Sequence, residues 1–349
     1  MDFYNLGSVG WLESQLIYHA LPRLGMEGLI LLSPNSPYVC IGRHQDAEQE
    51  VDLAFCESQG IPVFRREVGG GAVYLDGQQI FYQLVIRRDR LVAQGSKDDF
   101  YRRTLAPVIA ACRDLGLEAS YKPVNDILVG GRKISGNGAG EIGDAIILVG
   151  NLILDFDYDM MSRVLRVPDE KFRDKVNKSL RDNLTTLGRE LPAPPTMERV
   201  AAVLAVRFAE LLGPLTPQAL PPAVLAEVKR LAPELTAEPW LMRRGRQQPG
   251  RQIKVAAGRE VIQRAYKAPG GLIRGTFELA DGRFAAVEFS GDFFFFPPAE
   301  LDALALALVG APRAEAGAII EAFYAQRGIE SPGVTPADLA RVLAEDARV

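Results

Sequence analysis

The chain has 349 residues, of which 48% are hydrophobic and 24% charged, a balance typical of a folded protein with room for two domains. Its net charge is −4 without a run of like charges, so neither a nucleic-acid-binding protein nor one held at an anionic membrane surface is indicated. Three scattered cysteines, Cys40, Cys56 and Cys112, fit neither a disulfide framework nor a zinc site. Since no signal peptide or membrane-spanning apolar stretch is visible, we expect a cytoplasmic protein with reduced thiols.

The first two hundred residues mix helical and strand periodicities. Two hairpins are predicted, one around Asp76-Gly77 and one around Gly130-Gly131. The stretch that follows the last buried strand is expected to be helical and to end at Gly213. In chain order we predict a helix over 11–24, strands over 28–33 and 38–42, a helix over 52–60, strands over 61–64, 72–75 and 80–86, a helix over 98–116, and strands over 126–129, 133–135 and 145–155.

A proline-rich stretch, GPLTPQALPP at 213–222, marks the predicted domain boundary. We therefore predict a catalytic domain over 1–213, a linker over 214–222 and an accessory domain over 223–349. For the accessory domain we expect a helix, three or four strands with a hairpin at Asp281-Gly282, and two helices. The fold class is α+β in both domains.

The two histidines of the chain give little support for a histidine general base. His19 lies in an apolar, helical pattern, where a hydrogen-bonded structural imidazole is expected. His44 follows a predicted strand and could lie in a loop near a site. Neither has a serine or cysteine nucleophile motif nearby.

The stretch FRREVGGGAVYLD, at 64–76, places three consecutive glycines between two arginines and a strand-forming run. Bare backbone amides can form an anion-binding concavity, and Arg65 or Arg66 could add charge-assisted hydrogen bonds. The pattern lacks the Gly-Lys-Ser/Thr of a Walker A loop, and it leads into a strand and not into the helix of a dinucleotide fingerprint. A tight crossover between strands is the alternative interpretation.

A second stretch, VNDILVGGRKISGNGAGE at 124–141, places Lys133 on a short strand beside further glycines. Asn125 and Asp126 begin the preceding strand, where a carboxylate could hold Mg²⁺ together with substrate phosphates. The alternatives are a solvated turn lysine, a capping carboxylate, and a flexible loop over 136–140 that binds no ligand.

Together the two stretches resemble those of the lipoate–protein ligase family, whose fold is shared with biotin ligases and octanoyltransferases. Arg65-Arg66-x-x-Gly69-Gly70-Gly71-Ala72-Val73-Tyr74-x-Asp76 looks like the substrate-binding loop, and Asn125-Asp126 with Gly131 to Gly136 looks like the lysine motif. Ser290-Gly291-Asp292-Phe293 resembles a signature of the accessory domain in full-length ligases. The resemblance implies a mixed-sheet, biotin/lipoate-ligase-like catalytic domain with a small α+β accessory domain.

The resemblance also implies a two-step acyl transfer. ATP and lipoate would give lipoyl-AMP and pyrophosphate, and the acyl group would then pass to a lysine of a lipoyl carrier: H-protein, an E2 lipoyl domain or a dedicated lipoate-binding protein. We expect no nucleic-acid or membrane partner and a monomeric enzyme, with Asp126 as the candidate ligand of Mg²⁺. The implied catalytic residue is Lys133, and the implied binding residues are Arg66, Gly69, Gly70, Gly71, Ala72, Val73, Tyr74, Asn125, Asp126, Gly136 and Gly150.

Three positions depart from the family pattern. Val68 stands where a serine or threonine is usual, Leu75 where a histidine precedes Asp76, and Val149 where a histidine precedes Gly150. Drift at supporting positions is one explanation, and a ligase restricted to one acyl group or carrier is the other.

Other functions remain as alternatives. An octanoyltransferase with an acyl-carrier donor would need a cysteine nucleophile near the lysine loop or the last buried strand, and none of the three cysteines lies there. A catalytically silent lipoate-binding protein would fit the three departures but not the retained Lys133. The aromatic run at 293–296 could be a docking surface, but a buried strand end is the preferred interpretation.

Overall fold

The computed structural model describes residues 1–244, 253–256 and 259–344 and forms two compact units. The first unit comprises Met1–Ile41, Glu50–Val68 and Ala72–Leu241. The second comprises Met242–Val349 together with two short segments from earlier in the chain, Gly42–Gln49 and Gly69–Gly71. Within the described residues, no helix combines the length and apolar character needed to cross a membrane.

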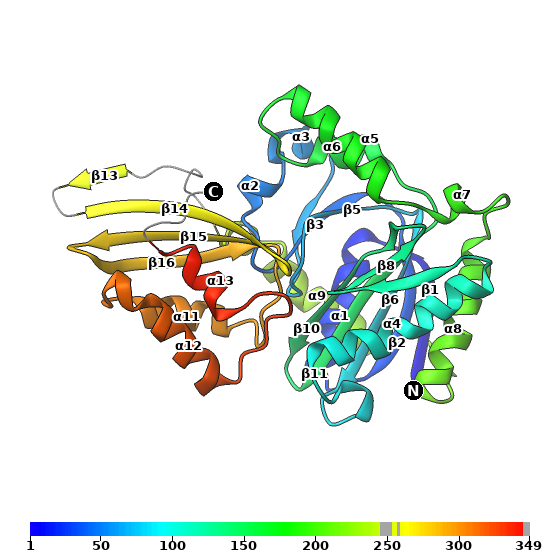
Figure 1. The fold of residues 1–349 in the computed structure, drawn as a ribbon. Helices are drawn as coiled ribbons and strands as arrows, with labels where there is room; N and C mark the ends of the chain where they lie inside the picture. Colours follow the sequence, from blue (N-terminus) through cyan, green and yellow to red (C-terminus); the bar gives the residue numbers. More distant parts are fainter. Residues whose placement is uncertain (245–252, 257–258, 345–349) are drawn as a thin grey trace. The chain divides into compact units, whose positions relative to one another are not determined.

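Helices and strands follow the order shown in Figure 1, where each is labelled. The strands up to Leu241 are β1 Asp2–Val9, β2 Gly28–Pro34, β3 Tyr38–Ile41, β4 Val63–Arg65, β5 Val73–Leu75, β6 Gln79–Arg87, β7 Ala119–Lys122, β8 Asp126–Val129, β9 Arg132–Ser135, β10 Asn137–Ile142, β11 Ala145–Ile153 and β12 Thr216–Pro217. The helices are α1 Trp11–Arg23, α2 Ala47–Glu50, α3 Leu53–Ser58, α4 Lys97–Asp114, α5 Tyr158–Val164, α6 Glu170–Asn183, α7 Leu187–Glu190, α8 Met197–Leu212, α9 Pro222–Leu235 and α10 Glu238–Leu241, with a 3₁₀ turn at Leu91–Ala93.

A six-stranded mixed sheet, in the order β10-β11-β6-β2-β1-β12, forms the centre of the first unit. The strands from β10 to β2 pair antiparallel, whereas β1 pairs in parallel with both β2 and β12. Alternating side chains of β6 reach opposite faces, as the period of two requires. Gln83 donates to the Ser14 carbonyl of α1 (2.6 Å), and the Tyr82 ring packs on Phe208 of α8. Helices therefore cover both faces of this sheet.

Two smaller sheets carry the motifs identified in the sequence. One has the order β4-β3-β5, with β4 parallel and β5 antiparallel to β3. The other is the antiparallel meander β7-β8-β9, in which β8 and β9 form the predicted hairpin around Gly130-Gly131. That prediction is confirmed, and both glycines have positive φ, as a tight turn needs.

The other predicted hairpin is wrong in its pairing. Both strands exist, but β5 pairs with β3 and β6 pairs with β2 and β11. The Asp76-Gly77 turn sends the chain from one sheet to another, because the fully buried β2 and the largely buried β11 supply the neighbours of β6. The glycine-rich stretch at 136–140 is likewise no flexible loop, since most of it belongs to β10 and pairs along β11.

The stretch predicted as a linker, 214–222, lies within the first unit. β12 pairs with β1, and the Gln218 amide donates to the Phe3 carbonyl (2.9 Å). Helix α9, predicted to open the accessory domain, packs against α1. The division after Leu241 therefore differs from the predicted boundary, because apolar residues of α9 such as Val224 and Leu231 are buried within the first unit.

The C-terminal part of the second unit contains an antiparallel four-stranded meander, β13-β14-β15-β16. β15 buries every second residue, as its sequence alternation predicted. Its strands and helices are β13 Ile253–Ala256, β14 Arg259–Ala268, β15 Gly271–Ala280, β16 Arg283–Gly291, α11 Glu300–Leu308, α12 Ala316–Arg327 and α13 Pro336–Arg341, with a 3₁₀ turn at Arg313–Glu315.

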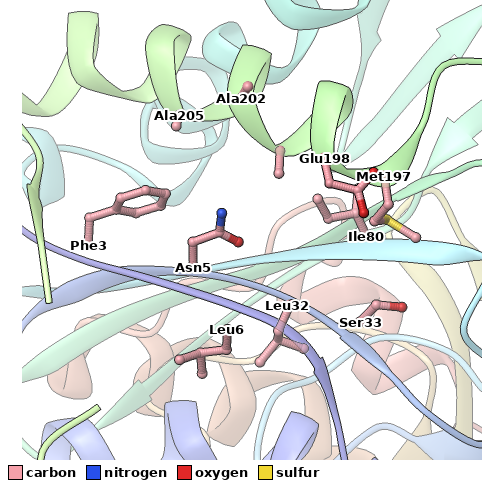
Figure 2. A pocket seen from close by; sticks show the side chains of 12 residues that line it. Phe3, Asn5, Leu6, Leu32, Ser33, Ile80, Met197, Glu198, Ala202 and Ala205 are labelled. Carbon is pink, nitrogen blue, oxygen red and sulfur yellow. The ribbon is translucent and has the colours of Figure 1, made fainter. Parts of the chain in front are cut away.

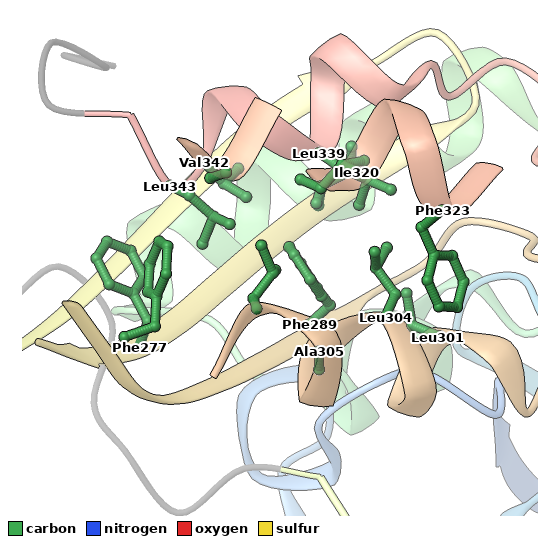
Figure 3. Packing of buried hydrophobic residues seen from close by; sticks show 14 of the residues in the cluster. Phe277, Phe289, Leu301, Leu304, Ala305, Ile320, Phe323, Leu339, Val342 and Leu343 are labelled. Atoms are coloured by element: carbon green, nitrogen blue, oxygen red, sulfur yellow. The ribbon is translucent and has the colours of Figure 1, made fainter. Parts of the chain in front are cut away.

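One hydrophobic core joins this sheet to its helices. Figure 3 shows Phe289 from β16 facing Leu304, Ile320 and Leu339 from the helices, while Phe277 from β15 lies beside Leu343. All four phenylalanines at 293–296 are buried, which confirms the preference for a buried interpretation of this run over an exposed docking surface. Phe293 and Phe295 belong to this core, and since each such aromatic side chain removes roughly 150–250 Å² from water, the two contribute a large part of it.

Candidate functional site

Lys133 and Asp126 form an ion pair across the β8-β9 hairpin. The Nζ of Lys133 lies 2.6 Å from Oδ1 of Asp126, and about a third of the lysine side chain remains exposed. The Lys133 backbone is fixed as well, since its carbonyl accepts from the Thr185 amide (2.8 Å). The strand thus presents an oriented ammonium group that solvent and a ligand can both reach.

Asn125 connects this hairpin to the central sheet. Its side-chain amide donates to the Asn137 carbonyl, and the Asn137 side chain donates back to the Asn125 carbonyl (2.9 Å). Asn137 also accepts from the hydroxyl of Tyr82, which lies 2.7 Å from the hydroxyl of Ser135. Burial raises the pKa of Tyr82 far above its usual value, so this hydroxyl keeps its proton. The network holds the start of β8 against β10.

Gly150 lies beneath this network, at a point where no side chain would fit. It is the register partner of both Tyr82 and Asn137. A Cβ at Gly150 would lie 2.2 Å from Oδ1 of Asn137 and 2.4 Å from the Tyr82 ring. The two neighbouring side chains can close over β11 only because this residue is glycine.

Gly136 lies directly beside the lysine side chain. A Cβ there would lie 3.4 Å from Cε and 3.6 Å from Nζ of Lys133. The Gly136 amide donates to Oδ1 of Asn151 (2.8 Å), and Asn151 in turn donates to Oε1 of Gln79 (2.6 Å). The structure therefore brings together five residues predicted from the lysine motif and the last buried strand: Asn125, Asp126, Lys133, Gly136 and Gly150.

Tyr82, Ser135, Asn137 and Asn151 were not singled out in the sequence, although they orient these residues. Ser135 and Asn137 lie inside the quoted motif, and Asn151 follows Gly150 directly. A polar residue within a buried strand needs a hydrogen-bond partner, and this signal could have identified Asn151. Tyr82 carried no such signal, because tyrosine is common in strands.

The two arginines before the glycines have different surroundings. Arg65 is fully buried and donates to the carbonyls of Trp240 and Leu241 (3.0 Å each), while the Trp240 indole donates to the Arg65 carbonyl (2.8 Å). Arg66 donates to the Cys40 carbonyl (3.2 Å) and contacts its sulfur (3.6 Å). Arg65 thus holds the end of the first unit, which leaves Arg66 as the candidate for ligand binding.

The residues after the glycines form β5. Ala72 and Val73 are partly exposed, and Tyr74 is buried with its ring edge-on to Phe156. Burial, followed by the carboxylates of Asp76 and Asp157, raises the pKa of Tyr74 to about 12. Gly69, Gly70 and Gly71 belong to the second unit, and Gly70 has a φ of 96°, which a side chain would strain.

The three apolar residues that depart from the family pattern are all at least partly buried. Val68 is fully buried, and its side chain lies where a Cβ on Gly140 would approach within 2.9 Å. Leu75 is buried beside Tyr38, its register partner on β3. Val149 is partly buried opposite Gln83.

The two histidines belong to different units and have different surroundings. His19 is buried on α1 and satisfied, with Nδ1 2.6 Å from the Gln15 carbonyl and Nε2 accepting from the Glu67 amide (3.2 Å). This confirms the structural role expected from the sequence. His44 belongs to the second unit and stacks on Phe293.

All three cysteines are buried thiols. Burial raises the pKa of Cys112 to about 12 and that of Cys56 to about 11. Burial also raises the pKa of Cys40, although the neighbouring Arg66 opposes this shift. A thiol in such surroundings is a poor nucleophile because little thiolate forms near neutral pH.

A metal ion could be held here only with help from a substrate. Across the described parts of the chain, no cluster of three or more histidine, cysteine, aspartate or glutamate residues could form a metal site. Mg²⁺, however, commonly uses one or two carboxylates together with substrate phosphates. Asp126 could supply one such carboxylate oxygen, so the residues present fit a phosphate-bound ion.

A separate cavity of about 410 Å³ lies in the first unit between β1 and α8. Figure 2 shows Phe3, Leu32, Ile80 and Met197 around it, with Glu198 as its acidic group. None of the predicted site residues lines this cavity.

The comparisons with known proteins decide the family. The family model of the lipoyl protein ligase A/B catalytic domain matches residues 12–209. The chain belongs to this family. That stretch contains both motifs quoted from the sequence, so the resemblance stated from Arg66 and Lys133 is confirmed at the level of the family.

Individual relatives agree with this family. The lipoate-protein ligase LplJ of Bacillus subtilis is 32% identical over 187 residues, which is 54% of each chain, so this chain spans about half of that relative's length. An octanoyltransferase LipM, from Kyrpidia tusciae, is 26% identical over 231 residues, 60% of this chain and 84% of the relative.

Solved structures show the same fold. A chain from the structure of a bipartite lipoate protein ligase and its E2 lipoyl domain from Thermoplasma acidophilum matches with a TM-score of 0.63 and 28% identity, over 71% of this chain and 98% of that one. LipL1 of Plasmodium falciparum, in complex with lipoate, matches with a TM-score of 0.67 and 16% identity, over 92% and 94%. The predicted fold class, an α+β ligase-like fold with mixed sheets, is confirmed.

Proposed function

We propose that this protein is an ATP-dependent lipoate–protein ligase that forms lipoyl-AMP and transfers the lipoyl group to a lysine of a carrier protein. The observation that carries the proposal is the ammonium of Lys133, held by Asp126 beside the bare backbone of Gly136, in a chain of this family. Membership of the family alone would not distinguish a ligase from a transferase.

In the activating step, a carboxylate oxygen of lipoate attacks the α-phosphorus of ATP, and the bond to the departing pyrophosphate breaks. Negative charge develops on the phosphoryl and acyl oxygens. The fixed ammonium of Lys133 offsets this charge, which is electrostatic stabilisation and needs no proton transfer by histidine. Arg66 and the amides of Gly71 to Tyr74 would bind the adenylate, and Gly69 and Gly70 would let the chain approach the acyl tail. Asn125 and Gly150 hold the lysine hairpin in place.

In the transfer step, the ε-amine of the carrier lysine attacks the acyl carbonyl carbon. An amide forms, the amine loses a proton, and AMP leaves. Mg²⁺, where it binds, would neutralise phosphate charge, and Asp126 is the residue that would hold it. The three apolar departures, Val68, Leu75 and Val149, favour an apolar acyl slot, where each buried methylene contributes about 0.8 kcal/mol.

The proposed partner is a small lipoyl-carrier domain. The solved relative from Thermoplasma acidophilum is described together with an E2 lipoyl domain. H-protein or a dedicated carrier would present the same chemistry, a lysine amine on an exposed turn. We also propose that the enzyme is monomeric and cytoplasmic and that its C-terminal part is an accessory domain.

The test begins with purified protein, ATP, Mg²⁺ and lipoate, without acceptor. Mass spectrometry should detect bound lipoyl-AMP and released pyrophosphate, and both should disappear in Lys133→Leu. The matched control is Lys229→Leu, which removes an exposed lysine of α9. If the wild-type protein leaves ATP intact, or if Lys133→Leu still forms lipoyl-AMP, the proposal fails.

An octanoyltransferase is the alternative that the relatives keep open. It would move octanoate from an acyl-carrier protein without ATP. The burial of all three cysteines, and the raised pKa of each thiol, argues against the covalent acyl-cysteine that such a route needs. Transfer from octanoyl-carrier protein in the absence of ATP would nevertheless establish this alternative.

A further inference from the structure

Two short segments from the first seventy-one residues belong structurally to the second unit. They are Gly42–Gln49, which follows β3, and Gly69–Gly71, the glycine run of the proposed substrate-binding loop. A loop that binds substrate is normally supported by the strands that flank it. Here β4 and β5 flank the run in sequence but lie in the first unit. The glycine run is therefore supported by residues much later in the chain, in the same unit.

The end of β16 supplies those contacts to the first segment. The Gly291 amide donates to the His44 carbonyl (2.9 Å). The His44 ring stacks on Phe293, with ring centroids 5.8 Å apart and planes at 11°. Phe293 itself is part of the hydrophobic core of the second unit. His44 is therefore tied to a rigid part of that unit by both its backbone and its ring.

The next residue, Phe294, supports the glycine run directly. A Cβ at Gly69 would lie 2.9 Å from Cδ1 of Phe294 and 3.1 Å from the Phe293 carbonyl, so the bare backbone of Gly69 rests on this ring. At Gly71 the nearest atom is Cβ of Asp292, at 3.8 Å. Gly42 closes the arrangement, because a Cβ there would lie 2.0 Å from the Gly70 carbonyl.

The aromatic run divides into two pairs by what its rings contact. Phe293 and Phe295 belong to the core formed by the sheet and helices. Phe294 is outside that core cluster, yet it is only 3% exposed, and it stacks on Phe296 with planes at 4°. The ring of Phe294 is thus held by Phe296 on one side and covers Gly69 on another.

From this arrangement we infer that Phe294 is a positioning residue for acyl activation, because its ring fixes the glycine run that binds the acyl adenylate. The inference rests on the proposed function. Three consecutive glycines lose more backbone entropy on ordering than other residues do. A ring that already holds them in place removes part of that cost before substrate binds. Phe294 would act through Gly69 and not on the reacting atoms themselves.

Removing the Phe294 ring should weaken the binding of lipoate equally in the ground state and in the transition state. Stacked aromatic pairs such as Phe294 and Phe296 contribute about 0.5–1.5 kcal/mol, and the loss of this much support for the glycine run would raise KM about two- to twelvefold. Phe294→Ala should therefore raise the KM for lipoate in lipoyl-AMP formation by this factor and leave kcat nearly unchanged. Hydrogen exchange should also quicken in a peptide covering residues 66–74.

Phe295→Leu is the matched control. It alters the neighbouring ring, which packs edge-on to Tyr324 in the core, whereas the ring nearest to Gly69 is that of Phe294. This variant should lose stability without raising KM or quickening exchange at 66–74. Phe294→Leu, which keeps an apolar side chain, should lie between wild type and Phe294→Ala.

The outcomes separate this inference from the proposed function. If the wild-type protein forms no lipoyl-AMP, the proposed function fails, and hydrogen exchange at 66–74 still decides whether Phe294 orders the glycines. If the wild-type protein is active but Phe294→Ala leaves both KM and exchange unchanged, the inference is overturned. An equal change in Phe295→Leu would also overturn it, because the effect would then be one of general stability.

Discussion

Replacing Gly150 by alanine tests whether the polar network above β11 is needed for the fold and for activity. The new methyl group would lie 2.2 Å from Oδ1 of Asn137 and 2.4–2.5 Å from two ring atoms of Tyr82. Both neighbours are at least nine-tenths buried, so neither can move into solvent. The hydrogen bonds from Tyr82 to Ser135 and Asn137 would have to break or shift.

The cost can be worked out from these contacts. Overpacking a buried site costs about 1–3 kcal/mol, and each lost hydrogen bond adds about 0.5–1.5 kcal/mol. Gly150→Ala should therefore lower the free energy of unfolding by about 2–6 kcal/mol. Because Asn137 also holds Asn125, formation of lipoyl-AMP should fall as well. Urea unfolding followed by circular dichroism, together with mass spectrometry of lipoyl-AMP, measures both effects.

A glycine-to-alanine control separates the clash from the substitution itself. Gly317 lies in α12, and the nearest atom to a Cβ there is 3.9 Å away, so Gly317→Ala should be neutral or stabilising by up to about 1 kcal/mol. An unfolding midpoint and a lipoyl-AMP yield for Gly150→Ala equal to those of wild type would refute the packing argument.

Three further predictions concern Gly136, the two arginines before the glycine run, and His19. Gly136→Ala should keep the fold, since its methyl group would only touch Cε and Nζ of Lys133 at ordinary contact distance. It should reduce lipoyl-AMP formation at least tenfold by occupying the space beside the ammonium that the proposed substrate uses, and full activity would show that this space is not used. Arg65→Met should lower the free energy of unfolding by about 2–4 kcal/mol, because the charged hydrogen bonds to Trp240 and Leu241 are lost. Arg66→Met should chiefly raise the KM for ATP or lipoate. If denaturation and kinetics gave the reverse result, the two arginines would not have these separate roles. Burial lowers the pKa of His19 below its unfolded value near 6.5, so the unfolded chain binds the extra proton more readily and stability should fall as the pH decreases from 7 to 5. His19→Gln should flatten this dependence in urea midpoints measured across that range, and an unchanged slope would exclude His19 as its source.

Local patterns predicted the helices and the motif strands well. The amphipathic periodicity over 98–116 corresponds to α4, and the glycine pair at 130–131 produced the β8-β9 hairpin that carries Lys133. In these cases the information needed lies within one turn or one helix face. The motif residues also lie within one short stretch, and its resemblance to the family's lysine motif is why Asn125, Asp126, Lys133 and Gly136 were assigned to one site before their distances were known.

Long-range pairing was not predictable in the same way. The turn at Asp76-Gly77 has hairpin chemistry, but β3 pairs with the strand before it and β2 and β11 with the strand after it. The prolines at 213–222 suggested a boundary, but β1 takes the short β12 as a neighbour. In both places a distant segment offered better burial or pairing than the local signal could indicate. The grouping of Gly69–Gly71 with residues near Phe294 also depends on contacts across more than two hundred residues.

The pairing of β12 with β1 affects how this protein can be divided for experiments. The family match ends at residue 209, before β12 and α9. A fragment cut there would expose the outer edge of β1 and the face of α1 that α9 covers. It would also lose Trp240 and Leu241, whose carbonyls receive the buried guanidinium of Arg65. An uncovered strand edge promotes aggregation. The shortest N-terminal fragment expected to be expressed without aggregation therefore extends to Leu241, about thirty residues beyond the end of the family match.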